Sequence, residues 1–295
     1  MTEASETSVR ARLRALLSNS RTEVEGRVTK VDTVFSGSIP ALYDKHMGPV
    51  IFEPYARDLA GRLSLPDAAR VLETAAGTGI VTRALLASLP AAVSIVATDL
   101  NQPMLDHAAK AVSSSRVVWQ KADAQSLPFD DGTFDAVVCQ FGAMFIPDKP
   151  TAYREARRVL KPGGCLVFNV WDKIEYNEFA DHVTAAVMEM FPGDPPLFLA
   201  RTPHGYHDKD AIVADVRSAG FVDVAAQTVT LRSVAPTSMD PAIGYCQGTP
   251  LRNEIEARDA GRLAEATVAA AARIAARFGN GPVDGMMQAH IVTAR

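Results

Sequence analysis

Cysteine is scarce in this chain, and long apolar runs are missing. The three cysteines, Cys139, Cys165 and Cys246, are far apart and share no motif. That spacing excludes a disulfide framework and the usual zinc patterns, and it favours a reducing compartment. No apolar stretch reaches the roughly 20 residues that a membrane-spanning helix needs. We therefore expect a cytoplasmic protein without a membrane span.

An excess of positive charge is also lacking. The 295 residues include 30 Lys and Arg against 34 Asp and Glu, a formal net charge of −4. Non-specific nucleic-acid binding needs a basic surface, so we expect no nucleic-acid partner. At 47% hydrophobic and 22% charged residues, the composition is that of an ordinary globular protein. The length suffices for one large core with an added cap.

The beginning of the chain has no signal-peptide core. Residues 7–17 are basic and amphipathic, as in an organelle presequence, but Glu3 and Glu6 oppose that interpretation. We predict instead a frayed or docked helical arm over residues 1 to about 35.

Aromatic and apolar residues recur at helical spacing over residues 41–65. Pro49 and Pro54 are expected to break this segment into short helices. It either covers a ligand as a lid or packs on the core. Residues 1–65 thus form a predicted helical arm and lid that precedes the main domain.

The middle of the chain alternates strands and helices. The predicted strands are 69–73, 93–98, 117–121, 134–140 and 165–171, and the helices between them are 79–89, 103–112 and 149–160. Such alternation predicts a parallel sheet covered on both faces, with ligands bound beyond the C-terminal ends of its strands. Glu73, Asp99, Asp123 and Gln140 all lie at or just past those ends.

The first strand meets the first helix in the stretch Val71-Leu-Glu-Thr-Ala-Ala-Gly-Thr-Gly-Ile80. Glycines let bare backbone approach a ligand, and the helix N-terminus points free N–H groups at it. A dinucleotide site needs a third glycine where this chain has Thr82. Glu73 would repel a pyrophosphate but attract a cationic ligand. The residues therefore favour S-adenosylmethionine over a nicotinamide dinucleotide, although Asp99 suits both.

Five segments in order resemble the motifs of class I S-adenosylmethionine-dependent methyltransferases. They are 71–80, 97–100 with Met104, 123–125, 127–135 and 158–164. The pattern is similar to the small-molecule branch that includes the ubiquinone and menaquinone C-methyltransferases, and it covers about residues 65–172. The resemblance implies an α/β, Rossmann-like domain over residues 66–295. Its mostly parallel sheet would have seven strands, with 222–234 as the sixth and an antiparallel 285–294 as the last.

The resemblance also implies which residues contact the cofactor. Glu73, Ala75, Gly77 and Gly79 would line the methionine end, and Asp99 would bind the ribose hydroxyls. Leu100 and Met104 would pack on the adenine, and Asp123, beside Ala124, would form a hydrogen bond to it. Gln140 and Phe141 would lie near the sulfonium. Tyr43 in the lid would close on the sulfonium through cation–π attraction. Met104 could instead be plain core, and Asp123 could cap a turn.

The residues that carry catalysis are open. Methyl transfer needs alignment and exclusion of water, and a base is needed only if the acceptor must lose a proton. His46 in the lid and His204 in a later loop are the candidate bases, with ordinary surface histidines as the alternative. The His204-Gly-Tyr-His207 pattern lacks further ligands, so we expect no metal. No Asp/Asn-Pro-Pro-Tyr/Phe motif follows residue 140, which disfavours a nucleic-acid acceptor.

Two insertions are longer than the fold needs. Residues 173–208 and 237–280 are predicted to form a helical cap over an apolar pocket walled by Phe145, Trp171, Phe179 and Tyr245, or else the interface of a homodimer. The hypothesis is methyl transfer from S-adenosylmethionine to a small, fairly hydrophobic metabolite, on carbon or oxygen. The alternatives are a non-catalytic cofactor-binding module and an NAD(P)-dependent oxidoreductase.

Overall fold

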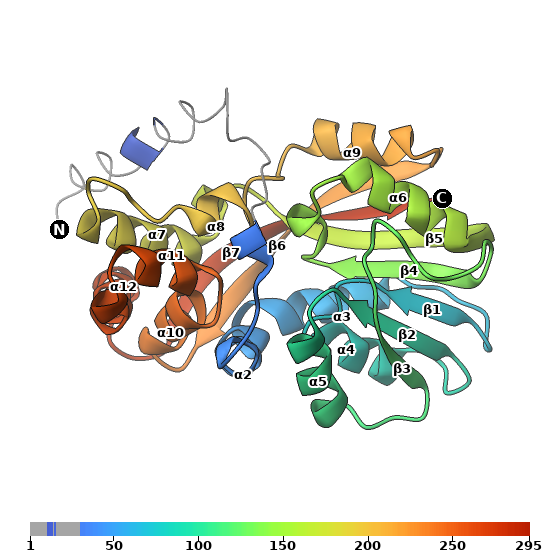
Figure 1. Ribbon diagram of the computed structural model, residues 1–295, viewed down its shortest axis with the longest axis horizontal. Helices are drawn as coiled ribbons and strands as arrows, with labels where there is room; N and C mark the ends of the chain where they lie inside the picture. The colour runs from blue at the N-terminus through green and yellow to red at the C-terminus, as the bar shows by residue number, and fades with distance from the viewer. Residues whose placement is uncertain (1–10, 14, 16–29) are drawn as a thin grey trace.

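The computed structural model of the protein describes residues 11–13, 15 and 30–295, and most of the predicted N-terminal arm lies outside them. Figure 1 shows a twisted sheet flanked by helices, and beside it a second group of helices around the far ends of strands β6 and β7. Among the described residues, no helix is both long and apolar enough to cross a membrane.

The sheet has seven strands in the order β3-β2-β1-β4-β5-β7-β6. The strands are β1 (Arg70–Glu73), β2 (Ser94–Asp99), β3 (Val117–Lys121), β4 (Phe134–Gln140), β5 (Leu160–Trp171), β6 (Val224–Ala235) and β7 (Val283–Ala294). Strands β1 to β5 pair in parallel, and β7 runs antiparallel to both β5 and β6. The predicted α/β fold with an antiparallel last strand is therefore confirmed.

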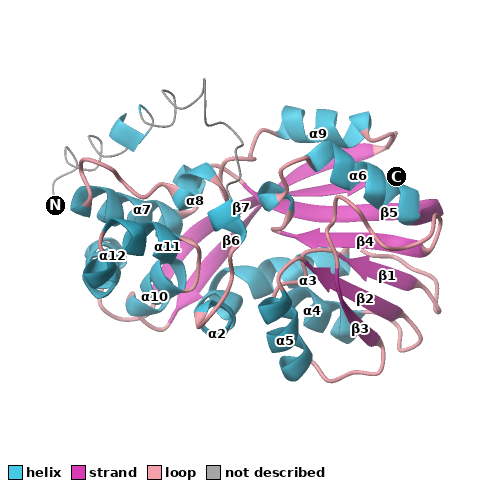
Figure 2. Cartoon of the chain, in the orientation of Figure 1, coloured by secondary structure: helices cyan, strands magenta, loops and turns pink. Residues whose placement is uncertain are grey.

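Helices cover both faces of the sheet (Figure 2). One face carries α3 (Glu53–Gly61), α4 (Ile80–Ser88) and α5 (Gln102–Ala111), and the other carries α6 (Lys149–Val159) and α9 (Lys209–Ser218). Successive residues of the interior strand β1, such as Val71 and Leu72, are both fully buried because the two faces are covered.

The segment before β1 is a continuous helical run. It comprises α2 (Ile39–Leu42), the π-helical η3 (Tyr43–Phe52) and α3. The expectation that Pro49 and Pro54 separate short helices was wrong. Pro49 lies inside the wider π-helical turns, where Glu53 N–H bonds to Gly48 O, five residues back. Pro54 lies in the first turn of α3, where its missing N–H is harmless.

A second group of helices forms what we call the cap. The cap comprises α7 (Glu178–Met190), α8 (Phe198–Arg201), α10 (Met239–Gln247), α11 (Leu251–Arg258) and α12 (Leu263–Phe278). The structure also has four short 3-10 turns, which are η2 (Lys30–Thr33), η4 (Ala143–Phe145), η5 (Ile174–Tyr176) and η6 (Ala260–Arg262). Helix α12 packs on α7 and α10 and buries Thr267, Ala270 and Ile274 on the side that faces them. Arg273 is also buried in this helix, and it pairs with Glu189 at 2.9 Å.

Candidate functional site

The loop between β1 and α4 turns tightly through two glycines. Gly77 and Gly79 have φ values of 56° and 80°, which favour glycine. A Cβ on Gly79 would lie 3.0 Å from the Trp119 ring, whereas a Cβ on Gly77 would meet only open space. Gly79 therefore serves packing, while Gly77 leaves bare backbone at a cavity. Ala75, with φ of 52°, shares the left-handed conformation and stores strain there.

The main cavity has a volume of about 250 Å³ and lies beyond the C-terminal ends of β1, β2 and β4. Ten of the twelve residues expected at the cofactor line it: Tyr43, Ala75, Gly77, Asp99, Leu100, Met104, Asp123, Ala124, Gln140 and Phe141. The cavity also has Phe35 and Phe145 in its wall. Residues separated by almost a hundred positions thus meet at one edge of the sheet, as the strand ends predict.

Asp99 ties the end of β2 to the glycine loop. Its Oδ2 accepts a hydrogen bond from Gly77 N–H at 2.9 Å, and its Oδ1 accepts one from Asn101 N–H at 2.7 Å. Burial raises the pKa of Asp99 above its ordinary value, although these hydrogen bonds act to lower it. Each carboxylate oxygen has more than one lone pair, so Asp99 can still accept hydrogen bonds from ligand hydroxyls in the cavity.

Glu73 and Gly79 are the two predicted cofactor residues that do not line the cavity. Glu73 is only 1% exposed, and its Oε2 accepts a hydrogen bond from Thr82 Oγ1 at 2.6 Å. Burial raises the pKa of Glu73 to about 8 despite that hydrogen bond. Thr82 occupies the position of the missing third glycine, so this departure from the dinucleotide pattern supplies the partner of the buried carboxyl.

A second, smaller cavity of about 40 Å³ adjoins the main one, and the two share Phe35, Tyr43, Phe141 and Phe145 as walls. Its other lining residues are Met47, Ile51, Phe52, Trp171, Phe198, Leu199, Pro203, His204, Tyr245, Thr249 and Pro250. Of the predicted pocket walls, only Phe179 is misplaced. It packs edge-on against Phe278, with ring centroids 5.3 Å apart, and over Gly285, where a glycine leaves room for its ring.

Stacked aromatic rings hold the partition between the two cavities. Phe141 stacks on Trp171 with centroids 3.7 Å apart, and Tyr43 stacks on Phe52 at 4.7 Å. Phe141 has φ of 49°, and its N–H donates to Asn169 Oδ1 at 2.9 Å. A strained backbone is tolerated here because the ring stack and the hydrogen bond both hold it. Nothing in the local sequence signals this conformation.

The two candidate bases lie in different surroundings. His204 lines the second cavity, and its Nδ1 lies 2.8 Å from the backbone oxygen of Asp172. Burial lowers the pKa of His204 to about 4. His46 is not among the residues that line either cavity, and its Nδ1 lies 3.4 Å from Asp240 Oδ1. The structure therefore brings His204, but not His46, to the site.

The lid helix is tied to the glycine loop through Asp44. Its Oδ1 accepts hydrogen bonds from Arg83 at 2.9 Å and from Thr78 Oγ1 at 3.2 Å, and its Oδ2 lies 3.2 Å from His107 Nε2. Burial acts to raise the pKa of Asp44, but pairing with Arg83 and His107 leaves it below its ordinary value. The predicted lid residue Tyr43, next to Asp44 in the chain, is thereby held at the cavity.

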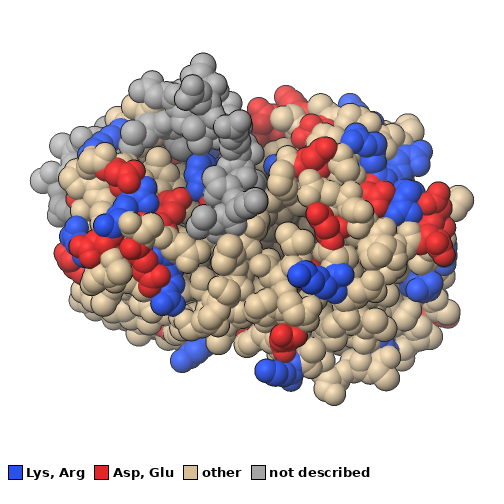
Figure 3. All heavy atoms as spheres, viewed as in Figure 1, with Lys and Arg blue, Asp and Glu red and all other residues tan. Residues whose placement is uncertain are grey.

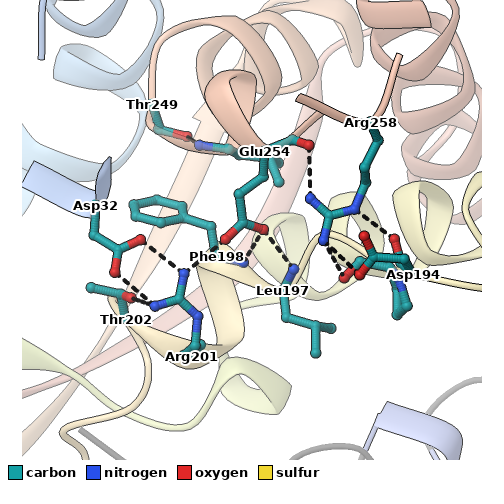
Figure 4. Close-up of polar contacts among 11 residues, drawn as sticks. Asp32, Asp194, Leu197, Phe198, Arg201, Thr202, Thr249, Glu254 and Arg258 are labelled. Carbon is teal, nitrogen blue, oxygen red and sulfur yellow. Dashed lines mark hydrogen bonds and ion pairs between the residues drawn. The ribbon is translucent and has the colours of Figure 1, made fainter. Parts of the chain in front are cut away.

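Residues 30–35 close the site from another side, which the sequence did not reveal. Asp32 is 2% exposed and accepts hydrogen bonds from both terminal nitrogens of Arg201, at 2.7 and 2.8 Å (Figure 4). Arg201 also donates to Glu254 at 2.7 Å, and Glu254 accepts from the first N–H groups of α8. This network joins the segment to α8 and α11, and it places Thr33 and Phe35 in the cavity wall.

The chain is similar to known methyltransferases. The Methyltransferase domain family matches residues 72–168. The chain is 29% identical over 184 residues to the mitochondrial 2-methoxy-6-polyprenyl-1,4-benzoquinol methylase of Caenorhabditis elegans, covering 58% of this chain and 64% of that protein, a little under two thirds. It is 32% identical over 178 residues to the ubiquinone/menaquinone biosynthesis C-methyltransferase UbiE of Enterobacter sp. (strain 638), covering 56% of this chain and 71% of that protein.

Solved structures share the fold. The phosphoethanolamine N-methyltransferase 2 of Haemonchus contortus, in complex with S-adenosyl-L-methionine, superposes with a TM-score of 0.55 at 14% identity, over 87% of this chain and 56% of that chain. At that identity the likeness concerns the architecture alone.

Proposed function

Because the chain belongs to the class I S-adenosylmethionine-dependent methyltransferases, we propose that it transfers a methyl group from S-adenosylmethionine to a small, largely apolar acceptor. The observation that carries this proposal is the pair of adjoining cavities. The larger lies at the strand ends beside the glycine loop, and the smaller lies under the cap. The cofactor would occupy the first, and the acceptor would reach it from the second through the shared aromatic wall.

The residues of the main cavity suit this cofactor. The bare backbone of Gly77 faces open space, and the half-exposed Leu100 and buried Met104 offer apolar surface for a flat base. The carboxylate of Asp99 would accept hydrogen bonds from the ribose hydroxyls, and Asp123 would bond the amino group of the adenine. The structural relative from Haemonchus contortus, which holds S-adenosyl-L-methionine, has the same fold.

When bound, the cofactor supplies a methyl group activated by positive sulfur. The chain itself has to orient the acceptor and exclude water. The stacked rings of Phe141 and Trp171 and of Tyr43 and Phe52 form a rigid apolar partition for that purpose. The electron-rich faces of such rings also attract a sulfonium, as they attract other cations.

The acceptor class is proposed from the second cavity. Its wall is almost wholly aromatic or aliphatic, which favours a hydrophobic ring system over a charged metabolite. One relative named above is a benzoquinol methylase and the other a ubiquinone/menaquinone biosynthesis C-methyltransferase, which agrees with an aromatic acceptor. We propose methylation on carbon or oxygen.

The cellular location of the enzyme and the class of its substrate are part of the same proposal. Three free cysteines support a cytoplasmic location. Lys and Arg side chains are interspersed with Asp and Glu on the face drawn in Figure 3, which supports a small-molecule substrate rather than nucleic acid.

Calorimetry and a transfer assay test the proposal together. We expect S-adenosylhomocysteine to bind the purified protein, and labelled methyl from S-adenosylmethionine to pass to members of a panel of quinols, phenols and fatty or polyketide acids. Binding without transfer to any of them would favour a non-catalytic module. Binding of NAD(P)H with no response to S-adenosylhomocysteine would refute the assignment.

A further inference from the structure

His204 presents an unused hydrogen-bond acceptor to the second cavity. Its Nδ1 lies 2.8 Å from Asp172 O, and a carbonyl can only accept, so the Nδ1 of the ring carries the proton. In that tautomer Nε2 has a free lone pair. Within the described part of the chain, the bond to Asp172 O is the one hydrogen bond that the ring makes, and the residue is only 6% exposed. Since the ring lines the cavity, a ligand there is the available donor.

The surroundings keep this nitrogen neutral. Burial among apolar side chains lowers the pKa of His204 to about 4, His207 acts in the same direction, and Asp172 acts against both. A neutral imidazole in an apolar pocket is a good acceptor for a hydroxyl proton, but a poor place to leave a positive charge. The hydroxyl of Thr249, which lines the same cavity, already donates to Tyr245 O at 2.6 Å.

The carbonyl that orients His204 is itself held in place. Asp172 N–H donates to Gln288 O at 3.1 Å, and the Asp172 carbonyl also accepts a hydrogen bond from Asn177 Nδ2 at 3.3 Å. The His204 ring also lies against Trp171, with ring centroids 6.0 Å apart. An acceptor fixed in this way is preorganised for one donor direction, which is typical of a recognition site.

The position of His204 decides which part of the acceptor it meets. His204 lines the second cavity and is absent from the wall of the main cavity. The second cavity is only about 40 Å³, so it has room for one edge of a ring, with the remainder extending past Phe141 and Phe145. The group that reaches His204 therefore lies on the far side of the acceptor from the main cavity.

We propose that Nε2 of His204 accepts a hydrogen bond from a hydroxyl on the methyl acceptor, and that it thereby selects hydroxylated aromatic compounds over their methyl ethers. The bonded hydroxyl is a recognition group, distinct from the atom that receives the methyl group. This inference rests on the proposed function and names its substrate class. An ether in the same place would leave Nε2 unpaired in an apolar wall, which a site of this kind rejects strongly.

The experiment compares 2-naphthol with 2-methoxynaphthalene, by calorimetry on protein saturated with S-adenosylhomocysteine. The wild type should bind 2-naphthol at least tenfold more tightly. His204→Asn can still donate to Asp172 O but has no acceptor at the place of Nε2. It should lower the affinity for 2-naphthol to that for the ether and leave the affinity for the ether unchanged. His204→Gln, whose amide oxygen can reach that place, should restore part of the preference.

The controls separate this inference from the proposed function. His46→Asn, a matched change outside both cavities, should alter neither affinity. The ¹⁵N chemical shift of His204 Nε2 should move on addition of 2-naphthol but not of the ether, which a purely structural role would not produce. Equal loss for both ligands in His204→Asn, or no loss for either, overturns the inference. If S-adenosylhomocysteine itself does not bind, the proposed function fails instead.

Discussion

Replacement of Glu73 by glutamine is expected to stabilise the protein in alkaline solution. The Glu73 carboxyl is 1% exposed, and its identified side-chain donor is Thr82 Oγ1, at 2.6 Å. Burial raises its pKa from 4.5 to about 8. Glutamine has the same shape and can still accept the Thr82 hydrogen bond through its amide oxygen, but it never carries a charge. The substitution therefore isolates the cost of ionising this buried group.

The direction of the effect follows from proton linkage. Below pH 4.5 both the folded and the unfolded chain hold the proton, so Glu73 contributes no pH dependence. Between pH 4.5 and about 8 the unfolded chain releases it and the folded chain keeps it, so the free energy of unfolding falls as the pH rises. Above pH 8 the loss levels off. Since one pKa unit corresponds to about 1.4 kcal/mol, the full loss is at most about 5 kcal/mol.

Urea unfolding of wild type and Glu73→Gln at pH 6 and pH 9, without ligand, measures this cost. The wild type should lose stability between the two conditions, and the variant should lose markedly less. Glu256→Gln is the matched control, because Glu256 pairs with Arg252 in the cap at a partly exposed position. It should keep the pH dependence of the wild type. If Glu73→Gln also keeps it, the carboxyl is already ionised at neutral pH and our reasoning about its burial is wrong.

Two further substitutions test the cavity and its closure. Asp99→Ala removes the acceptor of the Gly77 N–H and of the ribose hydroxyls. A hydrogen bond to a charged group contributes roughly 1.5–3 kcal/mol, so calorimetry should show at least tenfold weaker binding of S-adenosylhomocysteine. Unchanged affinity would place the ribose elsewhere. Asp32→Asn breaks a buried ion pair and should lower the free energy of unfolding in urea by about 3 kcal/mol. We expect the low end of the usual cost of breaking such a pair, because Arg201 still has Glu254 as an ion-pair partner. A loss below about 1 kcal/mol would contradict this.

The cofactor half of the site could be read from the sequence because its signals are local. Each strand end carries its own polar residue, as at Asp99 and Gln140, and a parallel sheet brings those ends together without further information. The glycines of the loop mark a backbone turn in the same local way. Glu73 is the residue whose surroundings the sequence left open, because it is absent from the cavity wall. Its place at the end of β1 was correct, but the sequence does not tell on which side of the loop its side chain lies.

The acceptor half could be predicted only in outline, because its contacts join distant positions. Asp32 and Arg201 are 169 residues apart, and no pattern in either segment indicates the pairing. The orientation of His204 likewise depends on a backbone carbonyl, which carries no residue-type signal. The insertions were predicted to form a helical cap, but the sequence does not indicate which aromatic ring of a helix faces a cavity. Phe179 was misplaced for that reason.

This division has a consequence for specificity. The main cavity is built largely from one sheet edge, whereas the second is built by the lid, the loop after β4, the loop after α8 and helix α10, which supply Tyr43, Phe141, His204 and Tyr245. The lid and α10 are also pressed together, because a Cβ on Gly244 would lie 2.8 Å from Met47 Cγ. Changes in these irregular segments can therefore reshape the acceptor pocket while the strand ends, which hold the proposed cofactor contacts, stay in place. That separation is a physical reason for one fold to serve different methyl acceptors.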